Sequence, residues 1–594
     1  MHHNYWLARR NDLTARLHDH PYDLVIYIER SVAYSNLEYH DLAAGDAYRA
    51  LLLTDAAQDE AEEYHVEAGE ALEKHLRHGV TKEGNYPRDI CPCQGRDDEV
   101  ATQFATHGDD IIQILAQRKA LQCYALLAQS LLQCGCVKSA MDFTNRGLAA
   151  SPGEGQLREI GDRILKKARK LLGNDKLEIE DLDMNELPDQ GLARREIYPW
   201  NEHEPCRFSQ ENLNILNGEM SRVAPKCEVK ALELPILADS RLADTVADRE
   251  TATIKQLGVF AKAAIEPGEV FLNESSALIA NNRLHESLCD ACSSAFPDIT
   301  STNQPLNVDA VSNVVSCPDC DDIFFCNEKC LSLALQTYHP ALCGKDVETI
   351  GKDAPLKETS NALYLVLLLR AIALAQTSST NPLGLKDVKY LWGDFVPPSS
   401  PKARRTASQT DVPVPNGTLP FSFTYNIASP LHILEKLDLD IFTLLPRYDL
   451  WIFNTLYAKF RGTASARVSL RDGRPEVCAV HPMWALANHD CDPNAAWEWG
   501  GEMKFWARQR RVPRHQDAKI DGTRAEVEME GGIAPGEEVL NHYCDIDLPV
   551  KERREWAVGS LGGWCMCERC KREEKEERAR ERRTAEAQEV ESRE

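Results

Sequence analysis

The chain has 594 residues, of which 43% are hydrophobic and 27% charged, a composition typical of several folded domains. Its formal net charge of −25 argues against a protein that coats nucleic acid and favours basic partners such as lysine-rich protein tails. The most apolar run, 362–369, is shorter than the ~20 residues of a membrane span, and the N-terminus lacks the apolar core of a secretion signal. We therefore expect an intracellular protein, in the nucleus, the cytoplasm or both, with no membrane contact and no direct nucleic-acid partner.

Residues 1–173 are predicted to be helical. Small and aromatic residues in 124–152 recur at spacings that resemble the tetratricopeptide helix pair of about 34 residues, and 27–51 holds a looser copy. Small side chains such as Ala43 and Ala140 would let paired helices approach closely. An irregular helical bundle is the alternative. The pair Cys91 and Cys93 has no second pair of ligands nearby, so we expect it in a loop.

Two stretches are predicted to lie outside the folded elements. The acidic stretch 174–189 has no sustained apolar face and predicts a linker. The stretch 397–420 is rich in Pro, Ser and Thr and cannot bury a core, so we expect a mobile insertion. Further predictions along the chain are helices at 356–375 and 449–460, a hairpin about Gly500-Gly501, and an exposed charged helix from Lys571 that packs on nothing.

A cysteine cluster is the most specific local signal. Seven of the 20 cysteines lie between Cys289 and Cys343, far more than an even distribution would place there. Pairs separated by two residues can present two thiolates to one zinc ion, and residues four apart share one face of a helix. Such spacings supply enough ligands for two closed structural sites: Cys289, Cys292, Cys317, Cys320, Cys326, Cys330, His339 and Cys343. A closed site stabilises a fold and leaves no coordination position open for hydrolysis.

Further motifs lie on both sides of this cluster. Before it, Gly258–Val270 predicts a strand, a Pro-Gly turn and a second strand. After it come Asn-His-x-Cys-x-Pro-Asn at 488–494, Gly-Glu-Glu-x4-Tyr at 536–543, and Cys-x-Cys-x2-Cys at 565–570. In this order, over roughly Cys227–Cys570, the motifs resemble a SET methyltransferase domain interrupted by a MYND zinc finger. This is the pattern of the SET-and-MYND (SMYD-like) protein-lysine methyltransferase family.

The resemblance implies an α+β chain. An N-terminal helical repeat-like domain would precede a β-rich SET fold that is split by the finger and by a helical insertion, with a post-SET zinc segment at the end. The expected boundaries are a helical domain at 1–173, a linker at 174–226, SET parts at 227–288 and 476–550, the finger at 289–343, a helical insertion at 344–475 with a disordered loop at 393–420, a post-SET segment at 551–570, and a charged tail at 571–594.

The resemblance also implies an activity and the residues that perform it. The chain would be a protein-lysine N-methyltransferase that uses S-adenosylmethionine, with a histone or another lysine-bearing protein as substrate. Tyr543 would be catalytic, with its hydroxyl beside the target amine. Gly258, Asn488 and His489 would bind the cofactor. Other proteins would bind to the finger and to the helical repeats.

Three structural zinc ions are part of the same expectation. In the cross-braced pattern of the MYND finger, one ion would take Cys289, Cys292, Cys326 and Cys330, and a second would take Cys317, Cys320, His339 and Cys343. Cys491 would join Cys565, Cys567 and Cys570 around the third.

The alternative is a catalytically inactive adaptor that keeps the SET and MYND architecture only to bind protein partners. Gln256, Asp490 and Leu561 favour this alternative, because family members usually carry Gly, Ser and an aromatic residue at these positions. The intact Asn-His pair of the first motif and Tyr543 favour the enzyme.

Overall fold

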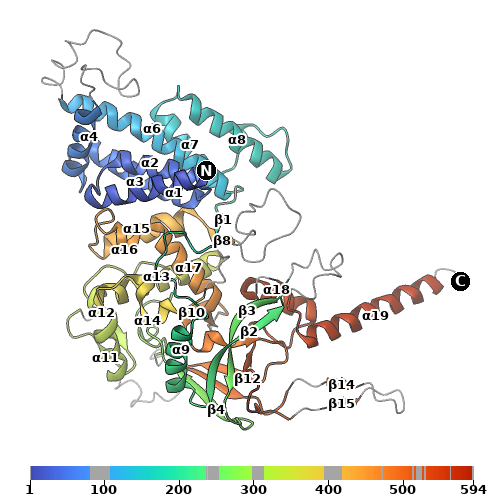
Figure 1. Cartoon of the computed structure of the whole chain (residues 1–594). Helices are drawn as coiled ribbons and strands as arrows, with labels where there is room; N and C mark the ends of the chain where they lie inside the picture. The colour runs from blue at the N-terminus through green and yellow to red at the C-terminus, as the bar shows by residue number, and fades with distance from the viewer. Residues whose placement is uncertain are drawn as a thin grey trace, which may run out of the picture. The chain divides into compact units, whose positions relative to one another are not determined.

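The structure is a computed structural model of the whole chain (Figure 1). It describes all residues except 1, 80–107, 236, 238–252, 297–313, 321, 393–417, 470–471, 512–513, 517–524, 528–529, 562 and 592–594. The fold is mixed α+β, as predicted, with an N-terminal helical region. The chain forms two compact units, one made of Met1–Arg195 with Thr418–Asn454, the other of Glu196–Gly417 with Thr455–Glu594.

Helices build the first unit, and the predicted helical region is present. They are α1 (His2–Asp19), α2 (Leu24–Asn36), α3 (His40–Gln58), α4 (His65–Gly79), α6 (Gly108–Cys134), α7 (Val137–Ala150) and α8 (Gly155–Leu172). The Asp23 carboxylate caps α2 by accepting the backbone N–H groups of Val25 and Ile26. Helix α3 contacts both α2 and α6, and Ala43 is fully buried, which fits its predicted role in close helix packing (Figure 1). The tetratricopeptide assignment itself stays a prediction.

A late segment of the chain completes this unit. It contains β8 (Thr418–Phe421), η5 (Thr424–Ala428), α15 (Ser429–Lys436), α16 (Leu445–Tyr448) and the start of α17 (Leu450–Thr463). Strand β8 pairs antiparallel with β1 (Gly191–Arg194). The buried Arg30 side chain bonds Asp46 at 2.7 Å and Asp449 at 3.3 Å, so ion pairs join the early helices to this segment. The predicted insertion 344–475 is therefore divided between the two units.

The second unit contains several small sheets, three of which contribute buried residues to one apolar core. They pair β2 (Cys227–Pro235) with β3 (Thr253–Ala261); β4 (Val270–Glu274) with β13 (Met503–Ala507) and β12 (Ala495–Trp499); β5 (Ile279–Asn281) with β10 (Pro475–Val480) and β9 (Ala464–Val468); β14 (Arg514–Gln516) with β15 (Ala525–Val527). Helix α9 (Gln210–Val223) packs its buried Leu216 and Met220 on this core. The predicted strand-turn-strand is present as β3 and β4, with Gly268 at φ +82° in the turn. The predicted hairpin is formed by β12 and β13.

The second unit also contains a long apolar helix. Helix α13 (Thr359–Thr377) follows the short η3 (Leu356–Glu358), and together they match the predicted helix at 356–375. By length and composition Leu356–Thr377 could cross a membrane, but 72% of its most apolar window is buried inside the structure, as is usual for a core helix. The second predicted helix, 449–460, is present as α17.

The charged C-terminal helix differs from its prediction. Helix α19 (Glu568–Glu591) packs on α18 (Val550–Leu561) through its first turns, and only its later part extends away (Figure 1). Glu573 accepts from Arg553 at 2.6 Å, and Glu574 pairs with Arg554 at 2.9 Å. Both arginines are almost fully buried. Alternating charge along α19 gave no sign of this contact, because the partner charges lie on another helix.

Two predicted loops fall largely outside the described residues. These are the segment with Cys91 and Cys93, and 393–417 of the predicted insertion loop. Residues 418–420 of that loop belong to β8, where the Thr-Leu-Pro sequence pairs with β1.

Candidate metal centres and the site beside them

The structure gathers the twelve predicted metal ligands into three groups of four, and the ligand atoms of each group lie within 4.8 Å of one another. Their membership matches the predicted pairing: Cys289, Cys292, Cys326 and Cys330; Cys317, Cys320, His339 and Cys343; Cys491, Cys565, Cys567 and Cys570. We refer to them as the first, second and third groups.

Local structure explains how the first group forms. Cys326 and Cys330 stand one turn apart at the start of α11 (Glu328–Thr337), with their sulfur atoms 3.6 Å apart. The Asn327 side chain caps this helix by accepting the Cys330 N–H at 2.9 Å. Cys292 reaches Cys326 at 3.6 Å from an earlier loop. The hydrogen bond from Cys289 is the main cause that lowers the pKa of Cys292, so that sulfur has thiolate character.

The second group interleaves with the first along the chain. Cys317 and Cys320 lie between β6 (Val315–Ser316) and β7 (Phe324–Phe325), and His339 begins the short α12 (His339–Leu342). The sulfur atoms of Cys317 and Cys343 are 3.9 Å apart, and Cys320 Sγ lies 3.6 Å from His339 Nε2. Each group therefore joins an early pair to a late pair, which cross-braces the segment 289–343.

The spacing of the sulfur atoms suits a tetrahedral ion. Around an ion with bonds of ~2.3 Å to sulfur, neighbouring sulfur atoms lie about 3.8 Å apart. Five sulfur pairs, drawn from all three groups, lie between 3.4 and 3.9 Å apart, and all ligand atoms of a group lie within 4.8 Å of one another. Thiolate and imidazole ligands at this separation are the donors that zinc prefers. These groups could hold zinc ions.

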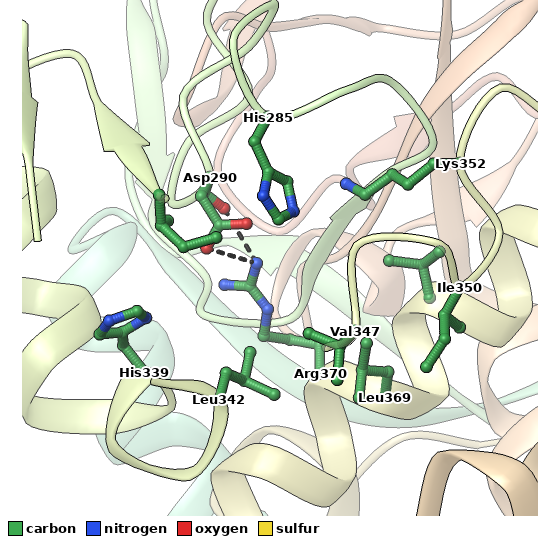
Figure 2. Close-up of a pocket in the computed structure, with 11 residues that line it drawn as sticks. His285, Asp290, His339, Leu342, Val347, Ile350, Lys352, Leu369 and Arg370 are labelled. Carbon is green, nitrogen blue, oxygen red and sulfur yellow. Dashed lines mark hydrogen bonds and ion pairs between the residues drawn. The ribbon is translucent and has the colours of Figure 1, made fainter. Parts of the chain in front are cut away.

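The ion pair between Arg370 and Asp290 lies beside a small cavity that His339 of the second group also lines (Figure 2). Together with Tyr338, this pair forms a cluster that we call the brace. The buried Arg370 of α13 pairs with Asp290 at 3.1 Å and stacks on the Tyr338 ring at 3.4 Å, and the Tyr338 hydroxyl donates to Asp290 at 2.8 Å. Burial would raise the pKa of Asp290, but Arg370 and Lys352 outweigh this and hold it below the ordinary value. The cavity measures about 30 Å³, which is room for one or two water molecules and not for a cofactor.

The third group lies next to a further thiol. Cys544 is buried within 4.8 Å of both Cys491 and His489. The backbone N–H of Tyr543 donates to His489 Nδ1 at 3.0 Å, so the proton of the neutral ring is on Nε2, which faces Cys491 Sγ at 3.3 Å. An imidazole that ligated a metal through Nε2 would carry its proton on Nδ1. That N–H would then face the Tyr543 N–H, and two donors cannot form a hydrogen bond. His489 is therefore a donor to the Cys491 sulfur and not a ligand in this arrangement.

Cys544 acts in the same way as His489. The hydrogen bond that its thiol donates is the largest cause lowering the pKa of Cys491, and the same bond raises the pKa of Cys544. Cys544 thus keeps its proton while Cys491 becomes the thiolate. Cys544 was not predicted to have a role, because a single cysteine after Tyr543 has no spacing typical of metal ligands.

The predicted cofactor residues meet where two short strands pair in parallel. Strand β11 (Asn488–His489) pairs with β16 (Leu540–Asn541). The Asn488 side chain donates to the Leu257 carbonyl at 3.0 Å and to Glu538 Oε1 at 2.7 Å. Gly258 lies directly beside them, since a Cβ there would come within 2.7 Å of Glu538 Oε1. Burial raises the pKa of Glu538 despite the lowering effect of Asn488.

Asn494 also links the 488–494 motif to the segment of Glu538 and Leu540, and it was not predicted as a functional residue. Its fully buried amide donates to the Glu538 carbonyl at 2.7 Å and accepts the Leu540 N–H at 2.8 Å. An asparagine offers one acceptor and two donor hydrogens on one rigid group, so it can link two backbone segments. Its position as the last residue of the 488–494 motif was the signal available in the sequence.

Tyr543 lies at the end of this arrangement. Its hydroxyl donates to the Ala487 carbonyl at 2.8 Å, and its ring lies 5.3 Å from the His489 ring. The preceding residue, His542, stacks on Trp497 at 5.7 Å, and Trp497 meets Trp484 edge-on at 5.3 Å. The structure thus brings the predicted catalytic residue and the predicted cofactor residues together.

The three departures from the family pattern each have a local partner. Gln256 accepts a hydrogen bond from Arg207 at 3.1 Å, and the Arg207 guanidinium lies 4.2 Å from the centre of the Trp392 ring. The Asp490 side chain accepts the Asp492 N–H at 2.7 Å. Leu561 packs against the cysteines of the third group.

No protein-family model matches the chain, and no curated protein matches it.

Proposed function

We propose that the chain is an S-adenosylmethionine-dependent protein-lysine N-methyltransferase of the SET-and-MYND kind. The observation that carries this proposal is the parallel pairing of β11 with β16. That pairing brings Asn488 against Gly258 and lies next to the contact of His489 with Tyr543, with the third cysteine group against His489. These residues come from separate parts of the sequence, and a site for two substrates requires that such groups be brought together.

The residues around Gly258 fit the amino-acid part of such a cofactor. The absence of a side chain at Gly258 lets Asn488 and Glu538, one amide and one carboxylate, lie directly against its backbone. An amide and a carboxylate can receive the carboxylate and the amino group of an amino acid. The bound cofactor would supply an electrophilic methyl group on a sulfonium sulfur.

In this proposal, the Tyr543 hydroxyl contacts the amine of the substrate lysine. A lysine must reach the methyl group without its proton, because an ammonium nitrogen has no lone pair. The Ala487 carbonyl takes the Tyr543 hydroxyl hydrogen, so the phenol oxygen is oriented to accept an N–H of a lysine amine. An apolar channel around that lysine would disfavour its charged form and lower its pKa.

We further propose that the three cysteine groups hold structural zinc ions. Each group has four protein ligands, which fill a tetrahedral ion and leave no position for a reacting molecule. The third group would tie α18 and α19 to the segment that carries Asn488 and His489. Zinc in that group would therefore support the cofactor site without taking part in the chemistry.

Calorimetric titration of the zinc-loaded protein with S-adenosylmethionine tests the proposal. We expect saturable binding to the wild type, loss of binding in Asn488→Ala, and binding within about twofold of wild type in Tyr543→Phe, because the phenol serves the amine. Asn273→Ala is the matched control, since Asn273 is exposed on β4 and bonds only Glu502 among the contacts described. Absence of binding to well-folded wild-type protein would contradict the enzyme.

The inactive adaptor is the second candidate, and one observation favours it. Asn488 Nδ2 already has two acceptors within the protein, Leu257 and Glu538, and Gln256 is held by Arg207. A site whose polar groups satisfy one another needs no ligand. Folded, zinc-loaded protein that leaves S-adenosylmethionine unbound would support this candidate.

A further inference from the structure

The first unit carries a cluster of aromatic side chains. Its residues are separated in the sequence from those of the proposed active site. Tyr22, Tyr64 and Phe442 come from three separate segments, and we call them the tyrosine platform. The Tyr64 and Phe442 rings meet edge-on with centroids 5.0 Å apart, and Tyr22 lies 5.7 Å from each of the other two. Phe442 is buried, while Tyr22 and Tyr64 are each partly exposed.

The tyrosine platform is held in place by a carboxylate. Asp440 Oδ2 accepts the Tyr22 hydroxyl at 2.6 Å, and Asp440 Oδ1 accepts the N–H groups of Phe442 and Thr443 at 2.8 and 3.2 Å. These three bonds fix the direction of the carboxylate and place a negative charge at the edge of the rings. The platform is therefore built in advance of any ligand.

Exposed acidic side chains surround the same rings. Burial is the largest cause that raises the pKa of Tyr22 and of Tyr64, and Asp440 and Glu63 raise both further. Glu67 adds to the effect on Tyr22 and Glu435 to the effect on Tyr64. Glu63, Glu67 and Glu435 are all exposed, so their charges face the solvent around the platform.

This combination has a defined chemical complement. The faces of aromatic rings attract cations, and the attraction adds to that of nearby carboxylates. A lysine ammonium, bare or alkylated, has an apolar stem that can cover a tyrosine ring and a charge that the acidic rim attracts. The chain carries a net charge of −25, which draws basic segments toward it over longer distances.

We propose that the tyrosine platform and its acidic rim bind a lysine side chain in a basic segment of a partner protein. This surface is a second lysine-binding place, distinct in its residues from Tyr543 and its neighbours. It serves an enzyme by holding a basic substrate and serves an adaptor by holding a basic partner. The inference therefore does not depend on methyl transfer.

Fluorescence anisotropy of a short labelled peptide of alternating Gly and Lys, added to the full-length protein without S-adenosylmethionine, tests the surface. We expect Tyr64→Leu to raise the Kd about five- to tenfold, since the ring contact is lost. Tyr64→Phe keeps the ring and should stay within about twofold of wild type. Tyr5→Leu is the matched control, because Tyr5 is 61% exposed on α1 and takes no part in the platform. An acetyl-lysine peptide, which has no charge, should bind at least about fivefold more weakly than the lysine peptide.

The inference is wrong if Tyr64→Leu binds the peptide as wild type does, or if Tyr5→Leu weakens binding equally. Should Tyr64→Leu fail to fold, the exposed pair Glu63→Gln and Glu67→Gln gives the answer, because neither side chain is part of a core. That double variant should weaken binding at least about threefold and reduce its salt dependence. S-adenosylmethionine titration of Tyr64→Leu should match wild type, so a failure of the proposed function would be seen separately.

Discussion

The sulfur atoms of Cys491 and Cys570 lie 3.4 Å apart, although 79 positions separate the two residues in the chain. Cys491 stands two residues after His489, whose ring donates to the Cys491 sulfur. An ion held by the third group would therefore connect the C-terminal helices to the proposed cofactor site. Several consequences of this connection can be measured.

Cys491→Ser should lose one metal ion and disturb the cofactor site together. After exposure to a weak chelator, we expect two ions per chain instead of three by mass spectrometry of the metals, because the third group loses the ligand that closes it. Proteolysis within 551–570 should become faster, and S-adenosylmethionine binding should be lost. Cys206→Ser is the control, since Cys206 is exposed and outside the groups, and it should keep all three ions. Normal cofactor binding in Cys491→Ser would contradict the connection.

Cys544→Ser should keep three ions. The Cys544 thiol donates to Cys491 and retains its proton, so the serine hydroxyl can replace it as a donor without removing a ligand. The same measurement on Cys565→Ser should show the loss of one ion. A loss in Cys544→Ser would identify Cys544 as a ligand and overturn the assignment of His489 and Cys544 as donors.

Asn494→Ala should destabilise the proposed site more than the removal of a few side-chain atoms suggests. The change leaves the half-buried Glu538 carbonyl and Leu540 N–H without the amide that bonds them, which costs up to about 1–3 kcal/mol for each unsatisfied group. Urea unfolding should show the loss, and hydrogen exchange in 538–543 should accelerate. Asn273→Ala, at an exposed position, should change stability by less than about 0.5 kcal/mol. Unchanged exchange in Asn494→Ala would show that the two motifs are held by other contacts.

Arg370→Met should weaken the segment that carries the first two groups. Removal of the guanidinium leaves the Asp290 carboxylate buried without its ion partner, which costs about 3–5 kcal/mol. The thermal transition of the zinc-loaded protein should fall, and chelators should remove metal from this segment faster. Arg474→Met removes an exposed pair with Asp472 and should have little effect. Equal behaviour of the two variants would exclude the brace as a source of stability.

Glu274 should make stability depend on pH near neutrality. Burial raises its pKa from 4.5 to about 7, against the lowering effect of the N–H groups of Met483 and Trp484. The folded state holds this proton more tightly than the unfolded state. The free energy of unfolding therefore falls as pH rises from about 4.5 to about 7, by at most about 3 kcal/mol. Above about pH 7 the loss is complete.

Glu274→Gln is the variant that isolates this effect. Gln does not titrate, so the difference in unfolding free energy between wild type and variant should shift in favour of the variant as pH rises from 5 to 8. Denaturant titrations at several pH values measure this difference. A difference that stays constant with pH would show that Glu274 titrates normally in the folded protein.

The sequence alone was sufficient where geometry is local. Cysteines two to four residues apart must lie within one turn of each other, which is why the pairs at 289–343 and 565–570 were predictable as metal ligands. Pro267-Gly268 and Gly500-Gly501 likewise determine turns: β3 and β4 flank the first turn but belong to different sheets, and the hairpin predicted at the second turn is present as β12 and β13. The joining of early and late cysteine pairs came from a family resemblance and not from spacing, because spacing does not say which pairs meet.

Contacts between distant segments were decided only by the tertiary structure. Nothing in the sequence near Arg30 indicates that Asp449 would pair with it, or that 418–454 would complete the helical unit. Cys544 and Asn494 gained their roles from the parallel pairing of β11 and β16, and the tyrosine platform exists only because three segments meet. The physical reason is that backbone preferences act over a few residues, whereas the burial of apolar surface acts on the whole chain and selects which distant side chains become neighbours.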